Sequence, residues 1–226
     1  EPLLALDPVY TVGRQIMEAI RQHERIGAAE ARGRALGLFE RVRIPSPERR
    51  LDAYPHEMSG GMRQRFGIAQ ALIGNPGLII VDEPTAGLDP EERNRFLNLL
   101  AEIGENVVVI LSTHIVEDVA DLCPRMAVLA AGRIQLEGAP LDLIQRTRGH
   151  VWAKTIGRDE LDAAKLHYEV ISTRLFAGRT IIHILSPEDP GDGFTAAHGG
   201  LEDVYFSTLS RSRRVPAATA SQFAAA

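Results

Sequence analysis

A run of apolar residues that ends in two acids is the feature that most constrains the fold of this chain. The run Leu78–Val81 is long enough for one strand and is followed directly by Asp82 and Glu83. A second apolar run, Val107–Leu111, comes after a segment with helical periodicity, Pro90–Ile103. Continuously apolar strands that alternate with helices are typical of parallel sheets covered on both faces. The pattern therefore predicts an α/β fold in which both strands are buried on both faces.

Apolar residues at helical spacing precede this pair of strands. They predict helices over Thr11–His23, with Thr11 as a candidate cap, over Ala28–Val42 and over Gly60–Ile73. A shorter helix is expected around Pro47–Ala53. Residues 1–57 are therefore expected to form a mostly helical subdomain.

The α/β pattern continues after the second apolar run with an expected helix at Ile115–Leu122 and strands at Met126–Leu129 and Arg133–Glu137. From about Gly149 the pattern is weaker, and turn residues between short segments indicate a small α+β extension over residues 148–210. The extension shows strand-like alternation at Thr180–Ile184 and a possible helix at Leu201–Leu209. Residues 211–226, which are rich in Arg, Ser and Ala, are expected to form a disordered tail.

The composition excludes several classes of protein. Apolar residues make up 45% of the chain, and the formal net charge of -5 argues against a protein that coats nucleic acid. The single cysteine, Cys123, excludes an internal disulfide and fits a reducing, cytosolic compartment. No apolar run approaches the roughly 18 residues needed to cross a bilayer, so a role at a membrane requires a spanning partner.

The acidic end of the first strand is a candidate site for phosphate chemistry. The carboxyl ends of strands in α/β sheets line the ligand crevice. There, Asp82 can hold a magnesium ion and Glu83 can polarise an attacking water. Taken alone, the same pair also fits an ordinary solvated strand end.

Three further elements give this pair a context. Ser59 can cap the helix that follows it, and Gly60 and Gly61 leave backbone N–H groups open to a phosphate. Asp89 lies in the loop after the first strand and can order neighbouring backbone. His114 follows the second strand, which brings it beside the two acids if the strands are neighbours.

Together, these residues resemble the second half of the motif set of the ATP-binding subunits of ABC transporters. Ser59-Gly60-Gly61-Met62 resembles the signature motif, and Leu78–Glu83 resembles the Walker B strand with its catalytic glutamate. Gly87–Asp89 resembles the D-loop, and His114 resembles the switch histidine. The resemblance covers about residues 1–145, and it implies the C-terminal part of a P-loop ATPase with its ATPase core at residues 58–147.

The resemblance implies a mechanism in which two ATPase subunits enclose two ATP molecules. Each ATP lies between the Walker A loop of one subunit and the signature motif of the other. Glu83 would polarise the attacking water, His114 would contact the γ-phosphate, Asp82 would bind Mg²⁺, and Asp89 would link the two sites. Loss of Glu83 or His114 is expected to reduce turnover more than binding.

The resemblance also implies cofactors and partners. The expected cofactors are ATP and Mg²⁺. The expected partners are a second ATPase subunit, in a homodimer or heterodimer, and transmembrane permease subunits at the cytoplasmic face of the inner membrane. No nucleic-acid partner is expected: a soluble ABC protein that acts on DNA or ribosomes fits the negative charge and the helical front less well.

One motif of the family is missing from the sequence. Walker A requires Gly-x-x-x-x-Gly-Lys-Ser/Thr, and the only lysines, Lys154 and Lys165, both follow alanine. The chain also begins at Glu1 rather than at Met. We therefore expect an N-terminally truncated chain that does not hydrolyse ATP alone. The alternative is a degenerate, non-catalytic subunit that only lends its signature motif to a partner.

Two groups within the family are represented. Segments that resemble the ATPases of oligopeptide and dipeptide importers are Glu1–Gly13, Ile44–Arg50 and Tyr54–Glu57. Segments that resemble drug or antibiotic exporter ATPases are Thr85–Pro90, Ser112–Asp118 and Leu201–Phe206. A natural mosaic and two genes joined near Met58–Arg65 both fit this pattern. The cargo and the direction of transport stay open, as does the role of residues 148–210, whose histidines lack metal-ligand spacing.

Overall fold

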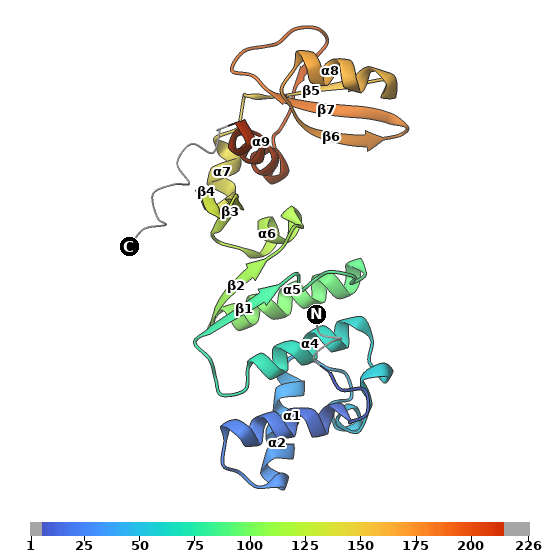
Figure 1. Ribbon diagram of the computed structural model, residues 1–226, viewed down its shortest axis with the longest axis vertical. Coiled ribbons are helices and arrows are strands. Elements are labelled where there is room, and N and C mark those ends of the chain that lie inside the picture. Colours follow the sequence, from blue (N-terminus) through green and yellow to red (C-terminus); the bar gives the residue numbers. More distant parts are fainter. Residues whose placement is uncertain (1–5, 215–226) are drawn as a thin grey trace, which may run out of the picture. The chain divides into compact units, whose positions relative to one another are not determined.

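The computed structural model describes residues 6–214 and divides into two units, Glu1–His114 and Ile115–Ala226 (Figure 1). Residues 1–5, part of the importer-like front segment, and residues 215–226, most of the expected tail, lie outside the described residues. The four-part division at residues 57, 147 and 210 stays a prediction.

The first unit begins with the expected helices. They are α1 (Val12–His23), α2 (Ala28–Arg41), α3 (Pro47–Leu51), the 3-10 helix η1 (Pro55–Glu57) and α4 (Gly60–Ala71). Thr11 caps α1, because its side chain accepts a hydrogen bond from the Arg14 N–H at 3.3 Å. The rings of Phe39 and Phe66 pack edge to face between α2 and α4. The predicted helices of this unit are therefore confirmed.

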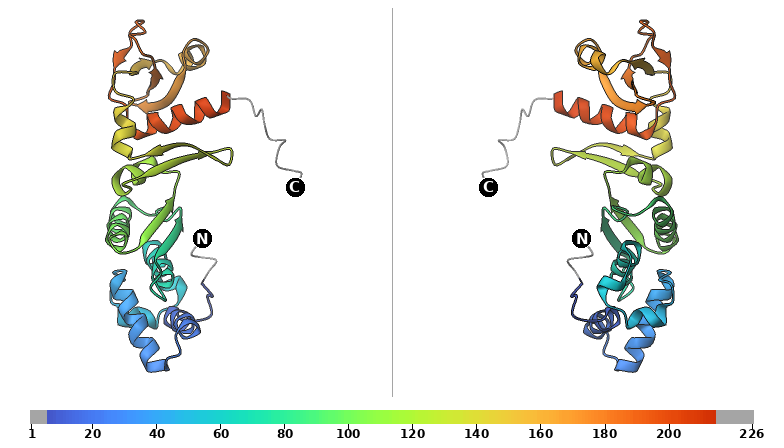
Figure 2. Two further views of the ribbon diagram at one scale, coloured as in Figure 1. Left: turned by 90° about the vertical axis from the view of Figure 1, so that its left-hand side faces the viewer. Right: turned by 90° about the vertical axis from the view of Figure 1, so that its right-hand side faces the viewer.

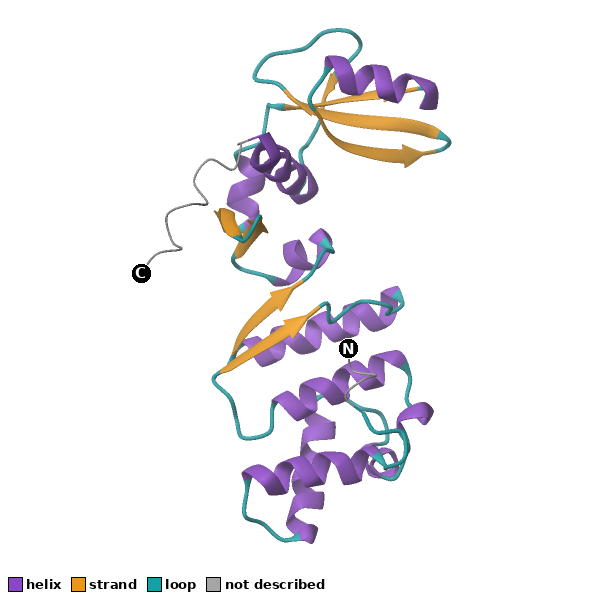
Figure 3. Cartoon of the chain, viewed as in Figure 1, coloured by secondary structure: helices purple, strands orange, loops and turns teal. Residues whose placement is uncertain are grey.

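Two parallel strands complete the first unit (Figure 3). Strand β1 (Leu78–Asp82) pairs with β2 (Val108–Ser112), and α5 (Pro90–Gly104) connects them. The register aligns Leu78 with Val108 and Asp82 with Ser112. The polar residues that end the two strands therefore lie side by side.

The prediction that both strands are buried on both faces is wrong. Ile79 and Val81 are buried, but the alternate residues of β1 and their neighbours on β2 form a largely exposed face. These residues are Leu78 (47% exposed), Ile80 (69%), Val108 (63%) and Ile110 (50%). Successive side chains of a strand point to opposite faces, and the described part of this unit covers only one of them.

The second unit starts with α6 (Val116–Leu122), the antiparallel hairpin of β3 (Met126–Ala130) and β4 (Arg133–Gly138), and α7 (Pro140–Gln145). A four-stranded antiparallel sheet with the order β6-β7-β5-β8 follows. Its elements are β5 (Val151–Ile156), the 3-10 helix η2 (Arg158–Glu160), α8 (Leu161–His167), β6 (Val170–Phe176), β7 (Arg179–Leu185) and β8 (Thr195–Ala196). The expected α+β character of the extension is confirmed, and the parallel pairing is confined to β1 and β2 among the described strands.

The last helix, α9 (Leu201–Arg214), packs beside the β3–β4 hairpin and α7 (Figure 2). Its Leu201 and Val204 form a buried cluster with Leu143 of α7. A separate cluster of Ile156, Ile182, Ile184 and Phe194 lies against the antiparallel sheet. Because α9 continues to Arg214, the prediction that the disordered tail starts at residue 211 is wrong for its first four residues. None of the described helices has the length and apolar character needed to cross a membrane.

Candidate nucleotide site

The carboxyl ends of β1 and β2 bring the predicted acids and the histidine together. The Ser112 hydroxyl donates a hydrogen bond to the Asp82 carboxylate across the two strands. Glu83, the next residue, has a left-handed backbone with φ of 46°. This conformation is strained for a residue with a side chain, and such strain is frequent at functional sites. The backbone N–H of Glu83 still donates to the Ser112 carbonyl at 2.8 Å, so the turn is held to the end of β2.

The carboxylate of Glu83 contacts His114 through both of its oxygens. The His114 backbone N–H donates to Oε1 at 3.0 Å, and Nδ1 lies 2.8 Å from Oε2. Thr113 Oγ1 also donates to Oε2, at 3.4 Å. The His114 side chain is 74% exposed, so it is open to a ligand from the solvent side. The geometry therefore gives an exposed acid–histidine pair at the crevice edge of the sheet.

The serine-glycine segment forms the start of α4. Ser59 Oγ accepts a hydrogen bond from the Met62 N–H at 3.3 Å, which confirms its predicted capping role. Gly60 is exposed, and a Cβ placed on it would meet only the Leu88 side chain, at 4.0 Å. The N-terminus of this 12-residue helix carries the positive end of its dipole. An anion can therefore approach the backbone here without a side chain in its path.

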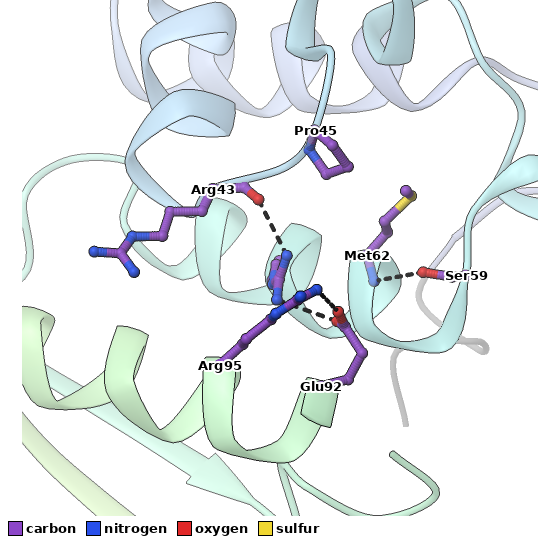
Figure 4. Close-up of a pocket in the computed structure, with 7 residues that line it drawn as sticks. Arg43, Pro45, Ser59, Met62, Glu92 and Arg95 are labelled. Atoms are coloured by element: carbon purple, nitrogen blue, oxygen red, sulfur yellow. Dashed lines mark hydrogen bonds and ion pairs between the residues drawn. The ribbon is translucent and has the colours of Figure 1, made fainter. Parts of the chain in front are cut away.

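Gly61 contributes in a different way. A Cβ at this position would lie 2.3 Å from Glu92 Oε2, so a larger residue would displace the Glu92 carboxylate at the contact between α4 and α5. The Glu92 carboxylate binds the buried Arg65 guanidinium at 3.1 Å, and Arg95 Nη1 at 3.1 Å (Figure 4). Arg65 also donates to the Arg43 carbonyl at 3.1 Å. This network joins the signature-like helix to the first turn of α5.

Asp89 of the D-loop-like segment is the N-cap of α5. Its Oδ1 accepts a hydrogen bond from the Glu92 N–H at 2.9 Å, and Pro90 occupies the first turn. The same residue that caps α5 therefore also fixes the backbone of Glu92, which contacts Arg65. A hollow of about 360 Å³ adjoins this network and is lined by Arg43, Pro45, Ser59, Met62, Arg65, Glu92 and Arg95 (Figure 4).

The sequence analysis missed part of this arrangement. The sequence pattern did not single out Arg65 and Glu92, which connect α4 and α5. It did single out Ser59 and Asp89, at the starts of these two helices. Ser112 and Thr113 were also missed as donors to the two acids. The signal that could have found Ser112 is the alignment of two parallel strands of equal length, since that places Ser112 opposite Asp82.

The residues present fit a nucleotide with Mg²⁺. Asp82 supplies oxygen atoms, which Mg²⁺ prefers, and the exposed start of α4 supplies N–H groups suited to phosphate. In the described part of the chain no group of three or more His, Cys, Asp and Glu side chains is arranged to hold a metal ion by itself. Mg²⁺ is usually bound by one or two carboxylates together with substrate phosphates.

Comparison with known proteins gives consistent matches. Residues 4–86 match the ABC transporter family. A probable peptide ABC transporter ATP-binding protein, y4tR of Sinorhizobium fredii, is 47% identical over 148 residues, which are 65% of this chain and 44% of that protein. The dipeptide transport ATP-binding protein DppD of Haemophilus influenzae is 42% identical over 150 residues, which are 66% of this chain and 46% of that protein. The chain therefore spans less than half the length of these relatives.

Solved structures give the same fold. The dimeric ATP-binding cassette MJ0796, bound to ADP and Pi after hydrolysis, superposes on this chain with a TM-score of 0.52 at 27% identity. The match covers 59% of this chain and 58% of the MJ0796 chain. The structure of cbiO1 of Clostridium perfringens, part of the transporter complex cbiONQ, is also similar to this chain. It superposes with a TM-score of 0.56 at 28% identity over 65% of this chain and 60% of its own. The α/β ATPase fold expected from the sequence is confirmed.

Proposed function

Since residues 4–86 of this chain match the ABC transporter family, we propose that the chain is part of an ATP-binding, ATP-hydrolysing subunit that drives transport through partner membrane subunits. The observation that carries the proposal is the contact between Glu83 and His114. Glu83 follows β1 and His114 follows β2, and the two residues make two contacts, at 3.0 Å and 2.8 Å. These contacts lie at the edge of the sheet where α/β proteins bind ligands.

The roles follow from what phosphoryl transfer requires. The reaction needs little covalent chemistry from the protein and depends on positioning and on stabilisation of charge. Mg²⁺, when bound, neutralises charge on the phosphates, and Asp82 is the residue that would hold it. We assign to Glu83 the orientation and polarisation of a water, and to His114 the contact with the transferred phosphate. Ser112 and Thr113 hold the two carboxylates in position.

The signature-like segment serves a different ATP. We assign the start of α4, with Ser59, Gly60, Gly61 and Met62, to the phosphates of a nucleotide bound by a second ATPase subunit. Asp89 then lies at the start of the neighbouring helix, where it can connect the two sites. The expected assembly is a pair of ATPase subunits on membrane permeases, at the cytoplasmic face of the inner membrane.

The names of the relatives support peptides as the cargo. The first protein is named a probable peptide transporter subunit and the second a dipeptide transport subunit. Each match extends over about two thirds of this chain. We propose peptide import as the transport that this subunit drives.

A mixing experiment tests the proposal. The full chain is combined with a purified ABC ATPase subunit that has an intact Walker A loop but an inactivated signature motif, and phosphate release is measured. The chain alone is expected to release no phosphate, whereas the mixture is expected to do so. Ser59→Ala should reduce the rate of the mixture, because it removes a hydroxyl at the start of α4. Thr11→Ala is the matched control, since it removes the cap of another 12-residue helix, α1.

Glu83→Gln separates the proposed function from its rival. In a second mixture, the partner subunit keeps its signature motif but has its own hydrolytic glutamate replaced by glutamine, so that the remaining phosphate release depends on Glu83. A reduction of roughly a hundredfold or more in Glu83→Gln relative to Glu40→Gln, an exposed control on α2, would indicate that this chain contributes its own hydrolytic acid. An unchanged rate together with a sensitive Ser59 would favour the second candidate, a non-catalytic subunit that lends its signature motif. The absence of a Gly-x-x-x-x-Gly-Lys motif from the sequence supports that candidate. Insensitivity to both substitutions would contradict both functions.

A further inference from the structure

The second unit contains a cavity that the nucleotide chemistry does not use. Its volume is about 530 Å³, within the range of small-molecule sites. Its apolar wall consists of Leu136, Leu143, Leu185 and Val204, which come from β4, α7, β7 and α9. These four elements all belong to the second unit, so the cavity lies within that unit.

Two cationic side chains line the same cavity. Arg146 follows α7 and Arg211 lies in the last turn of α9, and both are exposed. Neither guanidinium group makes a hydrogen bond or an ion pair with any described residue. His150 also lines the cavity, with its Nδ1 3.0 Å from the Arg148 carbonyl. Glu169, the one acid among the described residues of the lining, already accepts a hydrogen bond from Ser210 at 3.3 Å. The cavity therefore has an excess of positive charge.

The hydroxyl groups that line the cavity already donate hydrogen bonds within the chain. Thr147 Oγ1 donates to the Ile144 carbonyl at 2.8 Å. Ser207 Oγ and Thr208 Oγ1 both donate to the Val204 carbonyl, at 3.0 Å and 2.7 Å. The strong donors that remain for a ligand are the two guanidinium groups, and guanidinium pairs best with carboxylate, sulfonate or phosphate groups.

We propose that this cavity binds a small organic anion, free in solution, whose apolar body packs against Leu143 and Val204 and whose charged head binds Arg146 and Arg211. A ligand pocket typically combines a mostly apolar lining with a few convergent polar groups, and this cavity has both. Its volume suits a compact amphiphile rather than a two-chain membrane lipid. The proposal is independent of the ATPase function, because no residue of the cavity belongs to the first unit.

The single tryptophan of the chain provides a readout. Trp152 Nε1 donates a hydrogen bond to the carbonyl of Ser186 at 3.2 Å, and Ser186 lines the cavity. The full chain is titrated with octanoate, and Trp152 emission is recorded. A saturable change in emission is expected. With 1-octanol and octylammonium, which have the same apolar body but a neutral or a positive head, the change should be weaker by about tenfold in affinity.

Substitutions at the rim make the test specific. Arg146→Gln and Arg211→Gln should each weaken octanoate binding by about tenfold, because each removes a charge-assisted hydrogen bond. Arg158→Gln, at an exposed arginine of the same unit outside the cavity, is the matched control and should leave the affinity unchanged. All three arginines are exposed, so the variants should fold.

Three results would overturn the proposal. The first is equal binding of octanoate and octylammonium, which would show a purely apolar site. The second is equal affinity of the two rim variants and the Arg158→Gln control. The third is a Trp152 response to phosphatidylglycerol vesicles without any response to octanoate, which would assign the cavity to a membrane lipid instead.

Discussion

The two sheets of this protein differ in how much of their apolar surface the chain covers. In the parallel pair β1–β2, Ile79 is buried while its neighbour Ile80 is 69% exposed. In the antiparallel sheet of the second unit, Ile182 is fully buried and Ile184 is 3% exposed. Both sheets contain apolar strands. Among the described residues, β7 of the second sheet contributes to a buried cluster, although the end of the neighbouring strand β6 leaves Leu175 and Phe176 exposed.

The difference shows what an apolar strand encodes. Four apolar residues in a row specify that both faces avoid water, but they do not supply the layers that cover those faces. In β7 the buried residues alternate with partly exposed ones, and the chain provides a packing partner for the face that needs it. A strand pattern therefore predicts the environment that a sheet requires, whereas the other elements of the chain decide whether that environment exists.

The largest effect is expected from a matched pair of isoleucines. Ile182→Ala should destabilise the second unit by about 3 kcal/mol, because it removes buried methyl groups and leaves a cavity. Ile80→Ala should change the stability of the first unit by less than about 0.5 kcal/mol, since the side chain is already exposed. Urea unfolding measures both, with Trp152 emission for the second unit and far-UV circular dichroism for the whole chain.

The two isoleucine substitutions also test the comparison of the two sheets. A loss at Ile80→Ala as large as that at Ile182→Ala would mean that the exposed face of β1–β2 is covered in solution. Sedimentation at several concentrations would then show whether a second copy of the chain supplies the cover.

A buried acid, Asp203, contributes polar contacts to the stability of the second unit. Burial by itself would raise the pKa of Asp203, but hydrogen bonds from His183 Nδ1 at 2.8 Å, from the Gly200 N–H and from Ser172 hold this pKa below its ordinary value. These contacts attach α9 to strands β6 and β7. Asp203→Asn should therefore destabilise the second unit by about 2 kcal/mol at pH 7.

The sign of the pH dependence follows from the lowered pKa. The stabilisation is complete above the unfolded pKa of about 3.9 and is lost as the pH falls through the lower folded value. Wild-type stability should thus decline below about pH 4, whereas Asp203→Asn should decline less steeply. Trp152-monitored unfolding between pH 7 and pH 2 measures this, with Asp162→Asn, an exposed acid on α8, as control. Identical slopes for wild type and Asp203→Asn would refute the assignment.

The exposed face of β1–β2 gives a prediction about association rather than stability. Ile80→Ser combined with Ile110→Ser should reduce the concentration-dependent association of the purified chain, because exposed apolar patches promote self-contact. The free energy of unfolding should change by less than about 1 kcal/mol for the pair. Light scattering across a concentration series measures the association. Unchanged association would mean that this face stays solvated despite its composition.

Much of the fold and of the site could be predicted from the sequence, because local rules determine those parts. Thr11, Ser59 and Asp89 act as helix caps, and capping depends only on the residues that follow. The proximity of Glu83 to His114 followed from two strands of similar length in one parallel sheet. Motif order indicated the family, and residues 4–86 match the model of that family.

The remaining features depend on contacts between elements distant in sequence. The pairing of Arg65 with Glu92 requires the approach of α4 and α5, which no local pattern specifies. The exposed face of β1–β2 depends on how many layers the chain contains. For His183, lack of metal spacing indicated only a structural or solvated role, and its actual partner, Asp203, lies 20 residues away.

The smallest effect is expected from a surface network on the antiparallel sheet. A hydrogen bond from Lys154 at 2.8 Å, and then one from Tyr168 at 2.7 Å, lower the pKa of Asp192. Lys154→Met should raise the pKa of Asp192 toward its ordinary value while the Tyr168 contact keeps part of the effect. An NMR titration of the Asp192 side chain measures the change, and Lys165→Met on α8 is the control. Since these groups are on the surface, the unfolding midpoint should not move, and so the stability of this sheet should rest on Ile182 and Asp203 rather than on its surface charges. A clear loss of stability in Lys154→Met would mean that the network contributes to the core that distinguishes this sheet from β1–β2.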